Sequence, residues 1–141
     1  MDWVVIERKL ESLRRSLGRV KQKCPGNADA LVKDPDLQDI LALNLTRAVQ
    51  LSVDIGSHFV SDLDVPPPDT MGEVFDILSA EGIISPELAG RMKKAVGFRN
   101  LAVHNYDAIN WAIVYAIATD HLSDFEDFAK ALVRLKTTKG K

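Results

Sequence analysis

The chain has 141 residues, of which 46% are hydrophobic, and its 18 basic and 20 acidic residues give a formal net charge of −2. This length suits a single domain with its own buried core. The charge balance excludes indiscriminate adhesion to nucleic acid through bulk electrostatics, so any RNA or DNA site must be a local basic patch. We expect one helical domain over residues 1–136 and a flexible polar tail over 137–141.

The cysteine content and the first residues indicate a cytoplasmic protein. Cys24 is the single cysteine of the sequence, which excludes an intrachain disulfide and a cysteine-ligated metal cluster. The opening residues MDWVVIERKL lack the basic and apolar segments of a secretory signal. No run of about 18 apolar residues occurs, so we expect no membrane span.

Two long helices are predicted in the first half of the chain. Apolar residues recur at intervals of three and four over residues 2–22, which is typical of an amphipathic helix, and Pro25 and Gly26 end it. A second helix is expected from about Pro35 to Ser61. The Val-Pro-Pro-Pro stretch that follows must be an extended connector, because proline removes a backbone donor and clashes with the preceding helical turn.

Two short helices and one long helix are predicted in the second half. A capping box, Thr70 with Glu73, opens one short helix, and a Ser-Pro-Glu cap at 85–87 opens another that Gly97 ends or bends. A last long helix is expected over about 110–132, and no alternating strand pattern occurs. The sequence therefore predicts an all-α fold, an antiparallel bundle of three long and two short helices.

The predicted helix at 35–61 is apolar around most of its circumference and carries a single polar line. Arg47, Gln50, Asp54 and His58 follow one another at intervals of three, four and four, so they share one face. A helix that is buried on most sides should turn its polar line toward a cleft or a partner. The alternative is a small solvent-facing window in which Asp54 and His58 form a local pair.

Asp54 and His58 are also correctly spaced to share a metal ion. Di-metal helical bundles need Glu-x-x-His motifs, however, and this chain has none. Cys24 is unsuited to nucleophilic catalysis, because it follows the C-terminal end of a predicted helix, where the helix dipole opposes a thiolate. We expect neither a metal nor a cofactor.

The stretch FRNLAVHNY, residues 98–106, concentrates the polar chemistry of the chain in Arg99, Asn100, His104 and Tyr106. On a straight helix Arg99 and His104 point about 140° apart, whereas Asn100 and His104 share a face. Arg99 and His104 can therefore converge in two ways. Either the helix breaks here, or two copies of the motif meet across a symmetric dimer.

These residue types suit phosphodiester cleavage without a metal. Histidine exchanges protons near neutral pH, so two histidines from two chains would supply both acid and base. Arginine can hold the charge of a phosphorane-like transition state. The alternative is a capped junction between helices, with Arg99 in a salt bridge, His104 in a satisfied core position and Tyr106 as half-buried packing.

The segment ISPELAGRMKKAVGFRNLAVHNYDAINWAIVY resembles the signature region of the HepT-like branch of the HEPN superfamily. The likeness rests on Phe-Arg-Asn followed by Val-His-x-Tyr, and on the run of Gln50, Asp54 and His58. It implies a homodimeric all-α bundle with both motifs in one cleft, acting as a metal-independent endoribonuclease toxin on mRNA or tRNA. It also implies an antitoxin, the minimal nucleotidyltransferase MntA, which transfers AMP from ATP onto the motif tyrosine, here Tyr106.

This resemblance assigns roles to the motif residues. His104 is expected to act as general base or acid on RNA, Arg99 to bind the scissile phosphate, and Asn100 to orient His104 or to contact the backbone. From the polar line, Asp54 and His58 are expected to form a second layer behind them. AMP on Tyr106 would add bulk and negative charge that repel the RNA backbone.

Two further questions stay open at the level of sequence. Arg91, Lys93 and Lys94 precede the motif, and they either supply a local positive field for RNA or form an ordinary solvated helix face. The alternative function is a non-catalytic HEPN-fold module that binds a nucleotidyltransferase or small nucleotides, with the motif retained for dimer packing.

Overall fold

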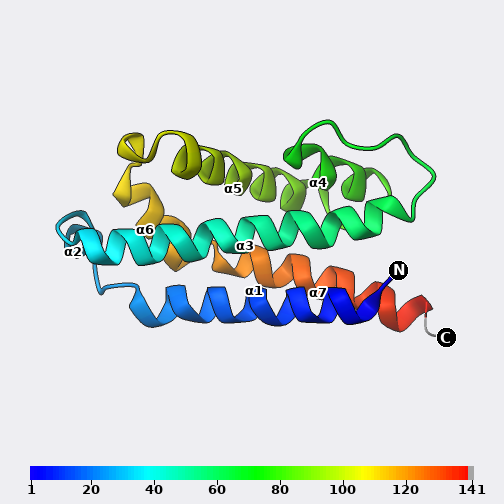
Figure 1. Ribbon diagram of the computed structural model, residues 1–141, viewed down its shortest axis with the longest axis horizontal. Helices are drawn as coiled ribbons and strands as arrows, with labels where there is room; N and C mark the ends of the chain where they lie inside the picture. Colours follow the sequence, from blue (N-terminus) through cyan, green and yellow to red (C-terminus); the bar gives the residue numbers. More distant parts are fainter. Residues whose placement is uncertain (140–141) are drawn as a thin grey trace.

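The protein is a bundle of helices in this computed structural model, which describes residues 1–139 and the side chains of residues 1–136 (Figure 1). The described residues contain no strand. Four helices make up most of the bundle: α1 (Trp3–Lys23), α3 (Pro35–Ser61), α5 (Pro86–His104) and α7 (Leu122–Lys139). Shorter elements join them: α2 (Ala28–Val32), α4 (Met71–Ala80), the 3-10 turn η1 (Tyr106–Ala108) and α6 (Trp111–Asp120). The expected all-α fold is confirmed.

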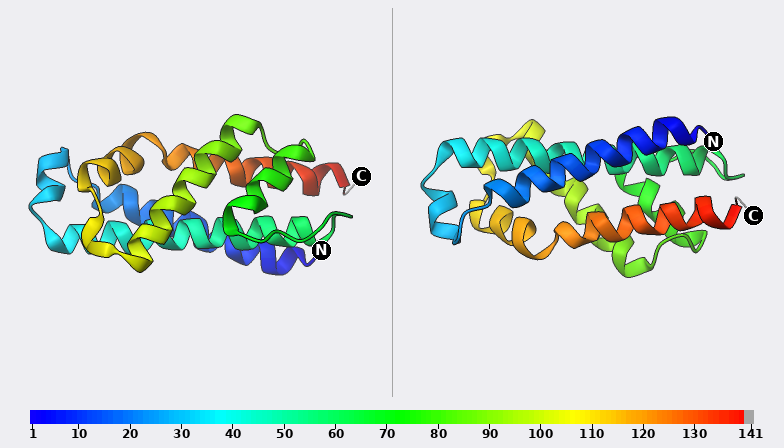
Figure 2. Two further views of the ribbon diagram at one scale, coloured as in Figure 1. Left: turned by 90° about the horizontal axis from the view of Figure 1, so that it is seen from above. Right: turned by 90° about the horizontal axis from the view of Figure 1, so that it is seen from below.

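The two N-terminal long helices begin at capping residues that the sequence supplies. The Asp2 carboxylate accepts hydrogen bonds from the amides of Val4 and Val5 at the start of α1, and Asp34 caps α3 in front of Pro35. The helices run antiparallel and lie side by side along most of their length (Figure 2). The predicted bounds of the second helix agree with those of α3.

The core lies between α3 and the helices around it. Edge-to-face aromatic pairs join α1 to α3 through Trp3 and Phe59, and α4 to α7 through Phe75 and Phe128. Helices α3 and α4 approach each other closely at Gly56, because an added Cβ atom would lie 2.7 Å from Cγ1 of Val74. Glycine is therefore what allows α3 and α4 to approach at this level of the bundle.

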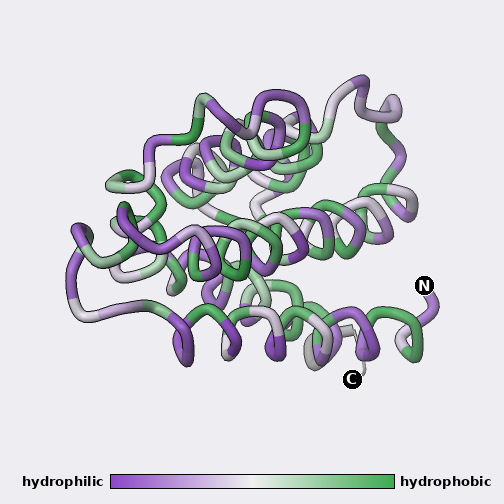
Figure 3. The backbone as a smooth tube through the Cα atoms, turned by 60° about the vertical axis from the view of Figure 1, so that its left-hand side comes forward, coloured by the Kyte–Doolittle hydropathy of each residue, from purple (hydrophilic) through white to green (hydrophobic). Residues whose placement is uncertain are grey.

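Hydropathy follows the helical turns. Hydrophilic and hydrophobic residues alternate along the tube in Figure 3, as expected for helices with one buried side. No helix within residues 1–139 combines the length and the apolar character that a membrane crossing requires.

Helix α5 differs from the sequence prediction, because it runs without interruption through Gly97 to His104 and is 19 residues long. Gly97 is exposed and neither ends nor bends it. Glycine lowers helix stability by only about 1 kcal/mol relative to alanine. The buried side of the same helix, which includes Met92 and Val96, offsets that loss by packing on the core.

The last predicted helix is divided in two, and a short helix was missed. His121 has a non-helical backbone between α6 and α7, and its side chain contacts Asp124, which also binds Arg91 of α5. The short helix α2 follows Asn27, whose side chain caps it. Of the tail expected over 137–141, residues 140 and 141 lie outside the described residues.

Candidate functional site

The FRNLAVHNY motif lies at one end of the bundle. His104 is the last residue of α5, and the Asn105 amide, which follows it, donates to the Leu101 carbonyl over 2.8 Å. The chain then turns through η1, and Asn110 caps α6. The N-terminal part of α3 lies at this same end, as do α2 and α6 (Figure 1). The motif is thus a helix end surrounded by short elements.

The unbroken α5 keeps Arg99 and His104 apart within one chain. Both residues belong to one regular helix, so their five-residue separation leaves them about 140° apart around its axis. Arg99 is half-buried and His104 is exposed. A break in the helix is therefore excluded as the way to bring them together within one chain.

Arg99 has no carboxylate partner among the described residues. Its Nη1 donates to Oδ1 of Asn100 over 3.1 Å, and its Nε is buried without a hydrogen-bond acceptor in this part of the chain. The junction alternative required a salt-bridged Arg99 and a core His104, and the structure shows neither. Asn100 contacts Arg99, and its carbonyl is directed at the guanidinium group.

Tyr106 is held by one hydrogen bond and one aromatic contact. Its hydroxyl donates to Oδ1 of Asp39 on α3 over 2.5 Å, and its ring meets Trp111 edge to face with centroids 5.6 Å apart. The side chain is 37% exposed. Partial burial raises the pKa of the Tyr106 hydroxyl above its ordinary value, and the hydrogen bond to Asp39 and the charge of that carboxylate raise it further.

Asp39 is a site residue that the sequence reasoning missed. It lies on the same face of α3 as Leu43, Arg47 and Gln50, because the intervals are four, four and three. The helix face that carries the polar line therefore continues past Leu43 to Asp39, two turns toward the N-terminus of α3. That extension was the signal that could have identified Asp39.

Asp54 and His58 lie away from the motif within one chain. Asp54 is 15 residues beyond Asp39, which corresponds to about 22 Å along α3. Its carboxylate accepts from Gln50 over 3.0 Å and pairs with Lys9 of α1 at 3.5 Å. The described residues hold no group of three or more His, Cys, Asp and Glu side chains that could bind a metal ion. This end of the polar line thus faces α1, not Arg99 or His104.

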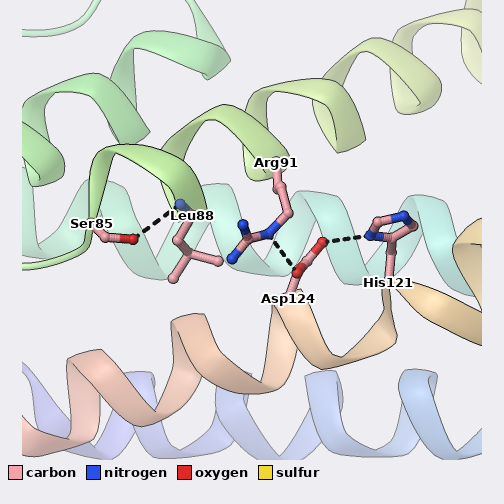
Figure 4. A network of polar contacts seen from close by, with 5 residues as sticks. All are labelled: Ser85, Leu88, Arg91, His121 and Asp124. Atoms are coloured by element: carbon pink, nitrogen blue, oxygen red, sulfur yellow. Dashed lines mark hydrogen bonds and ion pairs between the residues drawn. The ribbon is translucent and has the colours of Figure 1, made fainter.

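Two of the three basic residues ahead of the motif are already paired. Arg91 Nε donates to Asp124 Oδ1 over 2.8 Å, and the other oxygen of that carboxylate lies 3.2 Å from His121 Nδ1 (Figure 4). Lys93 pairs with Asp76 of α4 at 3.0 Å. Acidic partners therefore reduce the positive field expected on this face of α5.

An apolar groove separates α5 from α6 beside the motif. Phe98 and Leu101 line one wall, and Ile113 and Ile117 line the other. Ile113 is 58% exposed and Val103, inside the motif, is 50% exposed. Exposed apolar side chains that gather in one place are typical of surfaces that another molecule covers.

An all-α bundle with an Arg-x4-His-x-Tyr motif at a helix end is the arrangement expected of the HEPN class. The chain belongs to the HepT-like ribonuclease family, whose model, described as "Ribonuclease HepT-like", matches residues 13–132. The sequence-based assignment to this family is therefore confirmed.

The alignments with individual relatives span most of the chain. The "mRNA nuclease HepT" of Shewanella oneidensis is 33% identical over 124 residues, which are 88% of this chain and 92% of that protein. The "tRNA nuclease HepT" of Aphanizomenon flos-aquae is 33% identical over 107 residues, 76% of this chain and 73% of that protein. A solved structure of the tri-AMPylated Shewanella oneidensis HEPN toxin in complex with MNT antitoxin matches with a TM-score of 0.86 and 32% identity, covering 92% of this chain and 97% of the other.

Proposed function

We propose that this protein is a metal-independent endoribonuclease toxin that cuts RNA at a site formed by two copies of the chain around Arg99 and His104. A nucleotidyltransferase antitoxin of the MntA type neutralises it by transferring AMP to Tyr106. One observation carries the proposal: α5 runs unbroken through the motif, and within residues 1–136 Arg99 has no carboxylate partner while His104 is exposed at the helix end.

Arg99 supplies the phosphate-binding group of this site. A buried donor without an acceptor costs free energy in the isolated chain, and a phosphodiester oxygen is an acceptor that removes this cost. The planar guanidinium fork matches the geometry of a phosphate and stabilises the charge that builds up on it during cleavage. Asn100 holds one arm of the fork through Nη1.

His104 supplies the proton transfers. The histidine of one copy accepts the proton of the ribose 2′-hydroxyl while the new phosphorus–oxygen bond forms, and the histidine of the other copy gives a proton to the leaving oxygen. A single copy presents His104 on one side of α5 and Arg99 on another. A symmetric pair of chains can place both Arg99 and both His104 side chains around one phosphate.

The apolar side chains around the motif support a pairing of two copies. Val103 and Ile113 are exposed beside His104 and beside the α5–α6 groove, where a second copy would cover them. A two-fold interface repeats each contact, so a patch next to the motif brings the second motif to the same place. The cleft is then composite, with walls from both copies.

Tyr106 is the residue at which AMP transfer switches the nuclease off. Its hydroxyl lies at the surface two residues after His104, and Asp39 is positioned to take the phenolic proton. The tyrosine oxygen then attacks the α-phosphate of ATP, and pyrophosphate leaves as the AMP bond forms. The bound AMP carries negative charge into the RNA site. The tri-AMPylated state of the Shewanella oneidensis relative supports this assignment.

The nuclease activity is tested by incubating purified protein with total RNA and with tRNA in a metal chelator. We expect the wild type to cut RNA, and His104→Ala and Arg99→Ala each to lose on the order of a hundredfold or more in rate. His58→Ala is the matched histidine control and should keep most of the activity. If RNA incubated with the wild-type protein stays as intact as RNA incubated with His104→Ala, the proposed nuclease activity would be refuted and the non-catalytic module favoured.

The switch is tested by co-expressing the protein with the nucleotidyltransferase and measuring the intact mass. We expect one or more added AMP groups on the wild type, with loss of RNA cleavage, and none on Tyr106→Phe. A Tyr106→Phe protein modified to the same extent as the wild type would place the modification on another residue.

A further inference from the structure

A groove between α1 and α3 is lined by arginines and by no acidic residue among those described. Arg15 and Arg19 come from α1, Arg47 comes from α3, and neutral polar side chains such as Ser12, Asn44 and Gln50 lie between them. Figure 2 shows the two helices side by side over this length. The groove is therefore a positively charged channel built on rigid helices.

The charges of this arginine groove (Arg15, Arg19 and Arg47) are not neutralised by ion pairs within residues 1–136. Arg15 donates to the Ser12 hydroxyl over 3.3 Å, and Arg19 donates to the side-chain carbonyl of Gln22 over 3.0 Å. Both acceptors are neutral. The Glu11 carboxylate, four positions before Arg15 on α1, interacts with Arg15 through its charge but is hydrogen-bonded to Arg14, so the guanidinium groups of the groove have no acidic hydrogen-bond partner within residues 1–136.

A second groove, between α1 and α7, shows the contrast. It is lined by Arg14, Lys21, Lys130 and Arg134, so it contains more basic residues than the arginine groove. Arg14 pairs with Glu11 at 2.5 Å, however, and Lys21 pairs with Glu126 at 2.6 Å. Two of its four basic residues thus have carboxylate partners, whereas the three arginines of the arginine groove form no ion pair within residues 1–136.

The arginine groove leads to the motif. Asp39, which holds the Tyr106 hydroxyl, shares a face of α3 with Arg47. The two residues are eight positions apart, which is about 12 Å along the helix axis. An extended ligand at the motif end of the bundle can therefore continue along α3 into the groove without crossing the core.

We infer that the arginine groove binds the phosphodiester backbone of RNA that extends from the cleavage site, an inference that rests on the proposed nuclease function. A chain of net charge −2 needs a local basic patch to hold RNA, and acidic partners reduce the charge of the residues ahead of the motif. Arginine forks bind phosphate, while hydroxyl and amide side chains contact phosphate or sugar. Such contacts hold RNA of any sequence.

The test measures binding of a single-stranded RNA oligonucleotide to full-length protein in the His104→Ala background, which leaves the RNA uncut, at several salt concentrations. Arg15→Gln with Arg47→Gln should lower the affinity by about tenfold and make the salt dependence shallower by about 1.4, because each phosphate contact on a single strand contributes about 0.7 to the slope. Circular dichroism confirms that the variants keep the helical fold.

The matched control removes two paired charges from the groove between α1 and α7, with Arg14→Gln and Lys21→Gln. We expect this variant to bind RNA with the affinity and salt slope of the parent. Equal losses in both double variants would overturn the inference, because bulk charge would then explain them. Unchanged RNA binding in the Arg15→Gln and Arg47→Gln double variant would also overturn it. So would the finding that the arginine groove binds the acidic surface of a partner protein instead of RNA.

Binding and cleavage separate the two proposals. RNA binding that depends on the groove, together with a wild type that never cuts RNA, would refute the nuclease and leave the groove assignment standing. A wild type that cuts RNA, with groove variants that bind and cut equally well, would refute the groove alone.

Discussion

The Tyr106 hydroxyl and the Asp39 carboxylate are joined by a 2.5 Å hydrogen bond that links the end of the motif to the beginning of α3. This bond fixes the position of the tyrosine beside His104 and supplies an acceptor for its proton. AMP attached to the hydroxyl removes the donor and places a phosphate next to a carboxylate. Modification must therefore displace Tyr106 from Asp39.

Replacing Asp39 should change how Tyr106 ionises. In the wild type the Tyr106 pKa is raised, so the hydroxyl should lose its proton at a higher pH than an ordinary tyrosine. Asp39→Asn removes the charge, and the pKa should move down toward the ordinary value. NMR of tyrosine labelled at Cζ measures this, with Tyr106→Phe to assign the signal and Asp36→Asn as the control. An unchanged titration in Asp39→Asn would show that Asp39 has no effect on the hydroxyl.

The raised pKa of Tyr106 also predicts how the free energy of unfolding changes with pH. Because the pKa is raised in the folded state, the stabilisation is complete below the pKa of an unfolded tyrosine, about 10, and is lost as the pH rises through the folded value. The free energy of unfolding should fall more steeply above about pH 10 in the wild type than in Asp39→Asn. Urea unfolding at several alkaline pH values compares the two proteins.

A composite site makes activity depend on both copies. If each RNA cut requires His104 from both chains, a mixed dimer of wild type and His104→Ala is inactive. Co-expression of the two in equal amounts should leave about one quarter of the wild-type activity, because active dimers form as the square of the wild-type fraction. RNA cleavage at known subunit ratios measures this. A linear fall, to about one half, would show that each chain acts alone.

Asp124 should stabilise the break between α6 and α7. Its side chain is 13% exposed and holds both Arg91 and His121, so Asp124→Asn removes the charge that both contacts use. We expect a loss of about 1–2 kcal/mol in the free energy of unfolding, discounted because Arg91 is partly exposed. Chemical denaturation measures the change. Asp127→Asn, exposed on the same helix, should stay within about 0.5 kcal/mol of the wild type.

Two glycine substitutions should act in opposite directions. Gly56→Ala places a Cβ atom 2.7 Å from Val74 and should destabilise the protein by about 1–3 kcal/mol. Gly90→Ala in α5 meets nothing within 4 Å and should stabilise it by up to about 1 kcal/mol through helix propensity. Thermal unfolding distinguishes the two. If Gly56→Ala is as stable as the wild type, α3 and α4 can move apart at low cost.

Local patterns predicted the features that depend on neighbouring residues. The caps at Thr70 and Ser85 begin helices where expected, because a cap acts through amides two or three residues away. Gly97 was misleading, since its weak helix propensity gives way to the packing of α5 on the core. The division at His121 was missed, because the Arg91 partner of Asp124 lies 33 residues away.

The sequence by itself determined the all-helical class, the family and the geometric conflict between Arg99 and His104. These follow from short-range periodicity and from a compact motif. Only the tertiary structure decided that α5 continues uninterrupted to His104, that Tyr106 binds Asp39, and that Arg15, Arg19 and Arg47 line a groove between α1 and α3. Each of these depends on contacts between residues far apart in the chain, and such contacts are selected by how the whole core packs.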